Sequence, residues 1–117
     1  MILFKKEFIP KILDGTKTQT RRLGKKRWNV GAIYQCKCSW FGKPFAKVEI
    51  LSVQQEVLGN ISETDAKAEG FKNRHLFLLR FWAISEVLDF SELRELKVWV
   101  IKFRRCNIYP ELSSFVR

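Results

Sequence analysis

The chain has 117 residues, a formal net charge of +10 and 46% hydrophobic residues, among them ten Phe and four Trp. That length predicts a single domain over residues 1–117, and the apolar content is sufficient for a core, which excludes a disordered basic tail. No apolar run is long enough to cross a membrane, and Lys5, Lys6 and Glu7 interrupt the start before a secretory signal develops. The three cysteines favour a reducing, cytoplasmic setting over a disulfide scaffold.

The first elements are short. Ile2–Phe4 predicts an opening strand. A proline in the first turn and a glycine after the last one predict a short helix over residues 9–14. Thr16–Trp28 is polar and strongly basic, and we interpret it as a connecting segment.

A β-hairpin is expected in the middle of the chain. From Ala32 to Trp40 apolar and polar residues alternate with a period of two, which is typical of a half-buried strand. Phe41-Gly42-Lys43-Pro44 has the composition of a turn, and Phe45–Val53 is expected to be the return strand.

Two helix starts follow the hairpin. Ser62-Glu63-Thr64-Asp65 resembles a capping box and predicts a helix over residues 63–69 that stops at Gly70. Asn73 is suited to cap a second helix running through residues 76–85. That helix is apolar nearly all round, so we expect it to be buried or to form part of a docking surface.

The remaining segments settle the predicted fold class. Residues 87–96 have a mixed pattern compatible with a helix, and Val98–Phe103 is a β-branched and aromatic run that predicts a closing strand. Strands at both ends with helices between them predict an α+β fold. We expect a small β-barrel of about five or six strands with short helices packed outside.

The positive charge is concentrated near the N-terminus. Residues 1–53 carry twelve basic and three acidic side chains, whereas residues 54–117 carry ten and nine. The densest block contains Lys17, Arg21, Arg22, Lys25, Lys26 and Arg27, with no acid between them. Such a block attracts phosphate and indicates an RNA or nucleotide partner, the alternative being an ordinary solvated surface. Trp28, at its end, is a candidate base-stacking residue, with burial as the alternative.

The spacing of the cysteines raises the question of a zinc site. Cys36, Cys38, Cys106 and His75 would supply four zinc ligands, but zinc ligands normally come as close pairs on tight turns. We therefore predict no metal and no cofactor. His75 is the only histidine and is interpreted as a surface or capping residue, which leaves Lys, Thr, Glu and Cys for any catalysis.

The segment from Asp14 to Arg22 resembles the ASCH domain, a β-barrel related to the PUA domains that bind RNA. The ASCH signature is Gly-x-Lys-x-x-Glu-x-Arg after a short first helix, and Gly15, Lys17 and Arg22 match it in register. Further segments agree in order, although Ala32 replaces the usual Asp of the first: they are Val30–Tyr34, Ala46–Val53, Ile61–Gly70 and Val98–Phe103.

One departure from the signature is informative. Thr20 stands where the broad family has Glu. A subgroup with Lys-x-x-Thr-x-Arg is similar to amidohydrolases that remove the acetyl group of N4-acetylcytidine. This resemblance implies catalytic roles for Lys17 as base, Thr20 as nucleophile and Glu69 as proton carrier. Those enzymes are shorter, and the extra residues 71–96 are expected to reshape or cover the pocket.

Three functions stay open at this point. The first is an RNA- or nucleotide-binding domain in RNA metabolism, with a pocket around Lys17, Thr20, Arg22 and Glu69. Its RNA-binding residues would be Arg21, Arg22, Lys25, Lys26, Arg27 and Trp28. The second is an amidohydrolase that uses the same pocket. The third is an interaction module, or homodimer, that docks through the apolar helix at residues 76–84.

Overall fold

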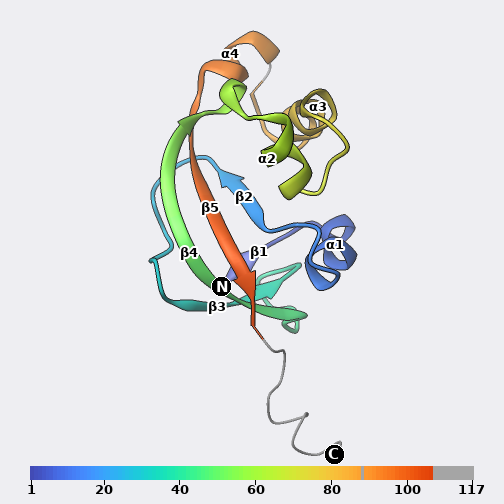
Figure 1. Cartoon of the computed structure of the whole chain (residues 1–117), viewed down its shortest axis with the longest axis vertical. Coiled ribbons are helices and arrows are strands. Elements are labelled where there is room, and N and C mark those ends of the chain that lie inside the picture. Colours follow the sequence, from blue (N-terminus) through green and yellow to red (C-terminus); the bar gives the residue numbers. More distant parts are fainter. Residues whose placement is uncertain (88, 107–117) are drawn as a thin grey trace, which may run out of the picture.

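A computed structural model describes residues 1–87 and 89–106. Five strands form one sheet in the order β1-β3-β4-β5-β2, in which β1 is parallel to β3 and the other pairs are antiparallel. The sheet curls strongly into a half-barrel (Figure 1), which confirms the predicted α+β class. The strands are β1 (Ile2–Leu3), β2 (Gln19–Arg22), β3 (Ile33–Lys37), β4 (Ala46–Val57) and β5 (Lys97–Arg105).

Short helices cover the concave side of this sheet, where α1, α2 and α3 lie, while α4 lies at one end (Figure 1). They are α1 (Ile9–Leu13), α2 (Glu63–Ala68), α3 (Arg74–Ile84) and α4 (Phe90–Glu95), with 3-10 turns η1 (Lys6–Phe8) and η2 (Leu58–Asn60). Both predicted caps are confirmed. The Ser62 side chain accepts from the Asp65 amide at 3.0 Å, and Asn73 Oδ1 accepts from the Leu76 amide at 2.9 Å.

The predicted hairpin is confirmed as β3 and β4, with Ile33 opposite Glu49 and Cys36 opposite Ala46. Strand β4 continues beyond Val53 to Val57 and pairs along its length with β5. The pairing register shifts between Ile50 and Ser52. A shift of this kind bends the strand locally, which fits the strong curl of the sheet.

The interpretation of residues 16–28 as a mere connection is wrong. Gln19–Arg22 is strand β2 at the sheet edge, with Gln19 opposite Lys102 and Arg22 opposite Trp99. Its Gln-Thr-Arg-Arg sequence holds no apolar residue, so hydrophobic periodicity gives no sign of it. The strand is nevertheless mostly buried, because acidic side chains from elsewhere in the chain form ion pairs with Arg21.

Two apolar clusters make up the core. One gathers the barrel residues, among them Phe8, and the other gathers residues of the helical layer, among them Phe77; Phe71 packs against both. The Lys17 ammonium lies 4.7 Å from the Phe8 ring centroid, and the Arg21 guanidinium carbon lies 6.0 Å from that of Phe77. Buried cations therefore contact both clusters.

Helix α3 is partly buried, as expected for the apolar segment at residues 76–84. Phe77 and Leu78 are buried, whereas Leu76, Leu79, Trp82 and Ile84 are 36–42% exposed. Docking of a partner on these exposed side chains stays a prediction. Within residues 1–87 and 89–106, no helix combines the length and the hydropathy that a bilayer span requires.

Candidate functional site

A buried polar cluster lies where β2 meets the end of α2. Lys17, Thr20, Arg21 and Glu69 are each only 3–4% exposed. Glu69 is the C-terminal cap of α2, and Lys17 lies two residues before the start of β2. The Thr18 amide donates to the Ala68 carbonyl at 2.7 Å, which holds the two segments together. This contact fixes Glu69 against the start of β2.

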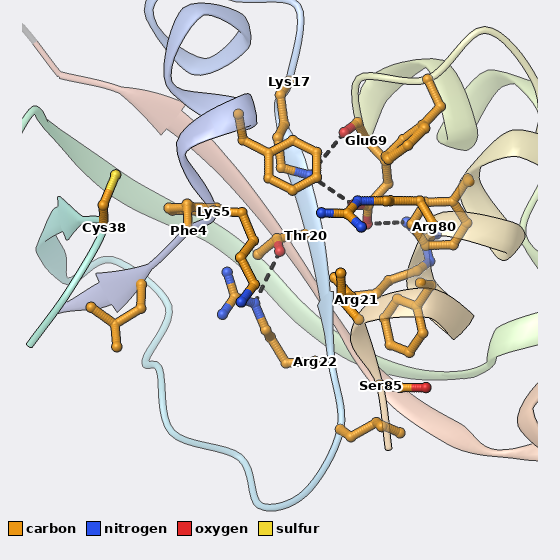
Figure 2. A pocket seen from close by; sticks show the side chains of 17 residues that line it. Phe4, Lys5, Lys17, Thr20, Arg21, Arg22, Cys38, Glu69, Arg80 and Ser85 are labelled. Atoms are coloured by element: carbon orange, nitrogen blue, oxygen red, sulfur yellow. Dashed lines mark hydrogen bonds and ion pairs between the residues drawn. The ribbon is translucent and has the colours of Figure 1, made fainter. Parts of the chain in front are cut away.

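The Glu69 carboxylate is held between two cations. Lys17 Nζ donates to Oε1 at 2.8 Å and also to the Glu69 backbone carbonyl at 2.8 Å, and Arg21 Nη1 donates to Oε2 at 2.9 Å (Figure 2). Each carboxylate oxygen thus receives a charge-assisted hydrogen bond. The pairing compensates for the removal of these charges from water.

Burial lowers the pKa of the Lys17 ammonium below its ordinary value, because the charged form loses its hydration. The Glu69 carboxylate opposes this effect, whereas the nearby Arg22 and Arg21 guanidiniums add to it. A lowered pKa favours the neutral amine, which is the form of lysine that can accept a proton.

Thr20 and Arg22 form a second pair beside the first. They are two residues apart on β2 and therefore share a face of the strand. Arg22 Nε donates to Thr20 Oγ1 at 3.0 Å (Figure 2). A cationic donor on this oxygen stabilises negative charge there and makes the hydroxyl a better nucleophile. The guanidinium carbon of Arg22 lies 4.9 Å from the centroid of the Phe4 ring, which supports it from one side.

Arg21 has a structural environment that the sequence did not reveal. Its Nη1 also donates to Gln19 Oε1 at 3.0 Å, and its Nη2 donates to Glu56 Oε2 at 3.0 Å and Asp65 Oδ2 at 3.2 Å. The side chain is wholly buried, so the prediction that Arg21 binds phosphate needs correction: both terminal nitrogens are already bound within the protein. Its Nε is buried without a hydrogen-bond partner among the described residues.

Gln19, Glu56 and Asp65 were not foreseen as part of the site. Gln19 Nε2 donates to Asp65 Oδ1 at 3.0 Å. This hydrogen bond, together with Arg21, lowers the pKa of the Asp65 carboxyl. The sequence pattern places Asp65 in a capping box, and Glu56 lies beyond the predicted strand Phe45–Val53. The only signal in the sequence was the need of a buried arginine for carboxylates, which does not say where in the chain they lie.

A cavity of about 400 Å³ opens beside these polar groups. Lys17, Thr20, Arg22 and Glu69 all line it, as the resemblance implied. Figure 2 shows them among the lining side chains. The rest of the lining is rich in aromatic rings: Phe4, Phe8, Phe71, Phe77 and Phe81. The volume lies within the range of small-molecule sites, roughly 300–1,000 Å³.

Helix α3 forms one wall of this cavity, through residues that include Arg80 and Ile84. Arg80 forms an ion pair with Glu7 of η1, which links the wall to the N-terminal part of the chain. Part of the segment at residues 71–96 therefore lines the pocket, while its effect relative to the shorter enzymes stays a prediction.

The last residues of the basic block differ in their exposure. Lys25, Lys26 and Arg27 are exposed. Trp28 is only 9% exposed and belongs to the barrel core, and its indole N–H donates to the Met1 carbonyl at 3.3 Å. Burial thus leaves little of this ring for the predicted base stacking.

Two of the four candidate zinc ligands, His75 and Cys36, lie in different environments. His75 is exposed at the start of α3, whereas Cys36 is buried in the barrel core, where loss of hydration raises the pKa of its thiol to about 12. In the part of the chain that the structure describes, no three His, Cys, Asp or Glu side chains gather in an arrangement that could hold a metal ion.

These features define a class of protein: a small half-barrel with a buried Lys–Glu–Arg cluster at the edge of an aromatic cavity. The family model for the ASCH domain matches residues 1–104. The chain therefore belongs to the ASCH domain family, as the motif around Lys17 and Arg22 predicted. No curated protein matches it in a sequence comparison.

Solved structures support the same fold. An ASCH domain from Lactobacillus crispatus JV V101 is 22% identical, with a TM-score of 0.59 over 83% of this chain and 69% of that one. Protein EF3133 from Enterococcus faecalis V583, of family model DUF984, is 16% identical, with a TM-score of 0.63 over 89% and 72%. Hypothetical protein PH0355 is 17% identical, with a TM-score of 0.67 over 90% and 96%. At these identities the likeness concerns the fold alone.

Proposed function

We propose that this ASCH domain binds RNA or a nucleotide in RNA metabolism, with a base or nucleoside in the 400 Å³ cavity and phosphates on the adjoining basic segment. The observation that carries the proposal is the combination of a polar cluster with aromatic walls in one cavity. Flat rings of a base pack well against Phe side chains, and buried donors and acceptors recognise its polar edge.

The polar groups of the cavity offer both kinds of hydrogen bond. The Thr20 hydroxyl accepts from Arg22 and retains its own proton for a ligand acceptor. Lys17 and Glu69 supply an ammonium and a carboxylate within one hydrogen-bonded pair. A base that presents both a carbonyl and an amino group would match this arrangement.

The exposed cations supply the electrostatic part of the proposal. Lys25, Lys26 and Arg27 begin three residues after the end of β2, so they lie close in sequence to the cavity residues Thr20 and Arg22. Contacts between such side chains and phosphates release counterions, and the affinity then falls as salt rises.

The test is fluorescence anisotropy with a labelled single-stranded RNA over a range of salt concentrations. Log affinity should fall linearly with log salt, and the double variant Lys25→Ala, Lys26→Ala should have a slope shallower by about 1.4, since each lost single-strand phosphate contact contributes ~0.7. Lys67→Ala with Lys72→Ala removes the same charge from exposed positions around α2 and serves as the matched control. An affinity that is independent of salt would contradict phosphate binding.

A second candidate, amide hydrolysis of an acetylated nucleoside such as N4-acetylcytidine, is favoured by one observation. Lys17, Thr20 and Glu69 line the same cavity, and burial lowers the pKa of Lys17. The Lys17 ammonium would first transfer a proton to the Glu69 carboxylate, to which it is hydrogen-bonded. Thr20 Oγ1 would then attack the acetyl carbonyl while the neutral Lys17 amine takes its proton, and protonated Glu69 would give its proton to the leaving amine. In the second half, water would attack the acetyl-Thr20 ester, giving one proton to Glu69, while Lys17 returns a proton to Thr20 Oγ1 and acetic acid leaves. Arg22 is suited to stabilise the oxyanion.

This sequence of steps requires a local rearrangement. Lys17 Nζ is hydrogen-bonded to Glu69, and Thr20 Oγ1 to Arg22. After its proton has passed to Glu69, the neutral Lys17 amine would therefore exchange its bond to the Glu69 side chain for one that it accepts from the Thr20 hydroxyl. Its N–H bond to the Glu69 backbone carbonyl would keep Nζ beside the carboxyl group.

Hydrolysis is tested with N4-acetylcytidine and liquid chromatography. Thr20→Ala, Lys17→Ala and Glu69→Ala should each abolish turnover, whereas Thr20→Ser, which keeps a hydroxyl, should retain part of it. Absence of turnover by the unmodified protein would remove the catalytic candidate for this substrate and leave the binding proposal standing.

A further inference from the structure

A second cavity lies beside the first. Its volume is about 310 Å³, and the residues that line it include Leu3, Arg22, Arg27, Trp28, Tyr34 and Trp40. Leu3 and Arg22 also line the 400 Å³ cavity. The two cavities therefore share a wall, and the Arg22 side chain is part of both. Neighbouring cavities of this kind suit two adjacent units of one extended chain.

The chemistry of the second cavity differs from that of the first. Its charged side chains are the two arginines Arg22 and Arg27, and no aspartate or glutamate is among the described residues that line it. Three aromatic rings face the same space: Trp28, Tyr34 and Trp40. Guanidiniums bind phosphate and also stack on bases, and aromatic rings stack on any base. This combination is typical of single-strand nucleic-acid binding.

Trp40 is the exposed ring of the set. It is 64% exposed in the turn after β3, whereas Trp28 is buried by the barrel core. Tyr34 is held by the Asn29 amide, which donates to its hydroxyl at 3.0 Å. Two of the rings are thus fixed by the fold. The third presents a large apolar face to water, and a stacked base would cover that face.

We propose that the second cavity receives the nucleotide next to the one in the first cavity, with its base on Trp40 and its phosphate near Arg22 and Arg27. The protein then recognises at least two consecutive nucleotides of a single RNA strand. This inference rests on the proposed function and narrows it, because a free nucleoside would occupy the first cavity alone.

The experiment compares ligands of two lengths. Isothermal titration calorimetry measures the four nucleoside monophosphates and the four homodinucleotides against the unmodified protein, Trp40→Ala and Phe41→Ala. Phe41 is the matched control, since it is the next residue, is 96% exposed and does not line the cavity. Thermal unfolding checks that both variants keep the fold.

The unmodified protein should bind dinucleotides more tightly than monophosphates. Trp40→Ala should weaken dinucleotide binding about tenfold, which corresponds to ~1.4 kcal/mol, and should leave monophosphate binding within about twofold. Phe41→Ala should leave both unchanged, and Trp40→Phe should restore most of the dinucleotide affinity.

Three other results would overturn the inference. Monophosphate binding with dinucleotide affinity unaffected by Trp40→Ala would contradict the second subsite alone. Equal losses in the Trp40 and Phe41 variants would indicate a general apolar surface, such as a protein-docking site, instead of a nucleotide subsite. Failure of every ligand to bind the unmodified protein would contradict the proposed function itself.

Discussion

Lys17 and Arg21 differ from Lys25 and Lys26 in almost everything except their charge. The first pair is buried and hydrogen-bonded to carboxylates, whereas the second, a few residues further along the chain, is exposed. In the sequence all four belong to one basic block with no acid in it. The carboxylates that pair with the buried cations belong to β4 and to α2 with its C-terminal cap.

Cations that are neighbours in the sequence can therefore have different roles in the folded protein. A cation remains ionised in the interior only when carboxylates compensate for its lost hydration, so the buried pair organises the cavity. The exposed pair keeps its full attraction for phosphate. The net charge of a segment therefore overstates the charge that an RNA would meet.

The largest expected effect is on folding and comes from Arg21. Arg21→Met should lower the free energy of unfolding by about 3–5 kcal/mol, because buried Glu69 loses one of its two cations and Glu56 and Asp65 lose their ion pairs with Arg21. Urea denaturation measures it. Arg27→Met, at an exposed position, is the matched control and should leave the unfolding midpoint nearly unchanged. Equal stability of the two variants would contradict the structural role of Arg21.

The second-largest loss of folding stability is expected at Lys17. Lys17→Met removes one of the two cations on Glu69 and should cost about 1.5–3 kcal/mol, less than Arg21→Met, because Arg21 still binds the other carboxylate oxygen. The double variant with Glu69→Gln should cost less than the sum of the single variants, measured by the same urea method. Additive costs would show that the two side chains act independently.

The loss of folding stability at acidic pH should depend in part on Asp65. Its pKa in the folded chain is lowered from 3.8 by the hydrogen bond from Gln19 and by Arg21, so its contribution is present above about pH 3.8 and is lost as pH falls through the lower folded value. Asp65→Asn should flatten the pH dependence of the unfolding midpoint below pH 4. An unchanged acid profile would speak against this hydrogen-bonded pair.

The exposed lysines should have the smallest effect on stability. The double variant Lys25→Ala, Lys26→Ala should leave the thermal midpoint unchanged, because neither side chain is buried. A clear loss of thermal stability in this variant would mean that the exposed and buried cations are not separate groups.

The parts of the fold set by local chemistry were predictable. The caps at Ser62 and Asn73 and the hairpin around residues 41–44 depend on neighbouring residues, and each is confirmed. Strand β2 was missed because its stability comes from partners far along the chain: Arg21 and Glu69 are 48 residues apart. No local pattern records such a pairing.

The candidate site also contains residues that the sequence could predict and residues that it could not. Lys17, Thr20 and Glu69 were placed by resemblance to a family motif, and they do line one cavity. The position of Trp28 at the end of the basic block allowed either base stacking or burial, and its ring lies in the barrel core. The sequence could not decide between these alternatives, because the exposure of a side chain depends on the whole fold.

The most direct test of the account is an NMR titration of the ¹⁵N-labelled protein with each nucleoside monophosphate. We expect the largest amide shifts on residues of the 400 Å³ cavity, foremost Lys17, Thr20 and Glu69, with smaller shifts at Lys25 and Lys26. Shifts confined to the exposed lysines, with none in the cavity, would contradict it.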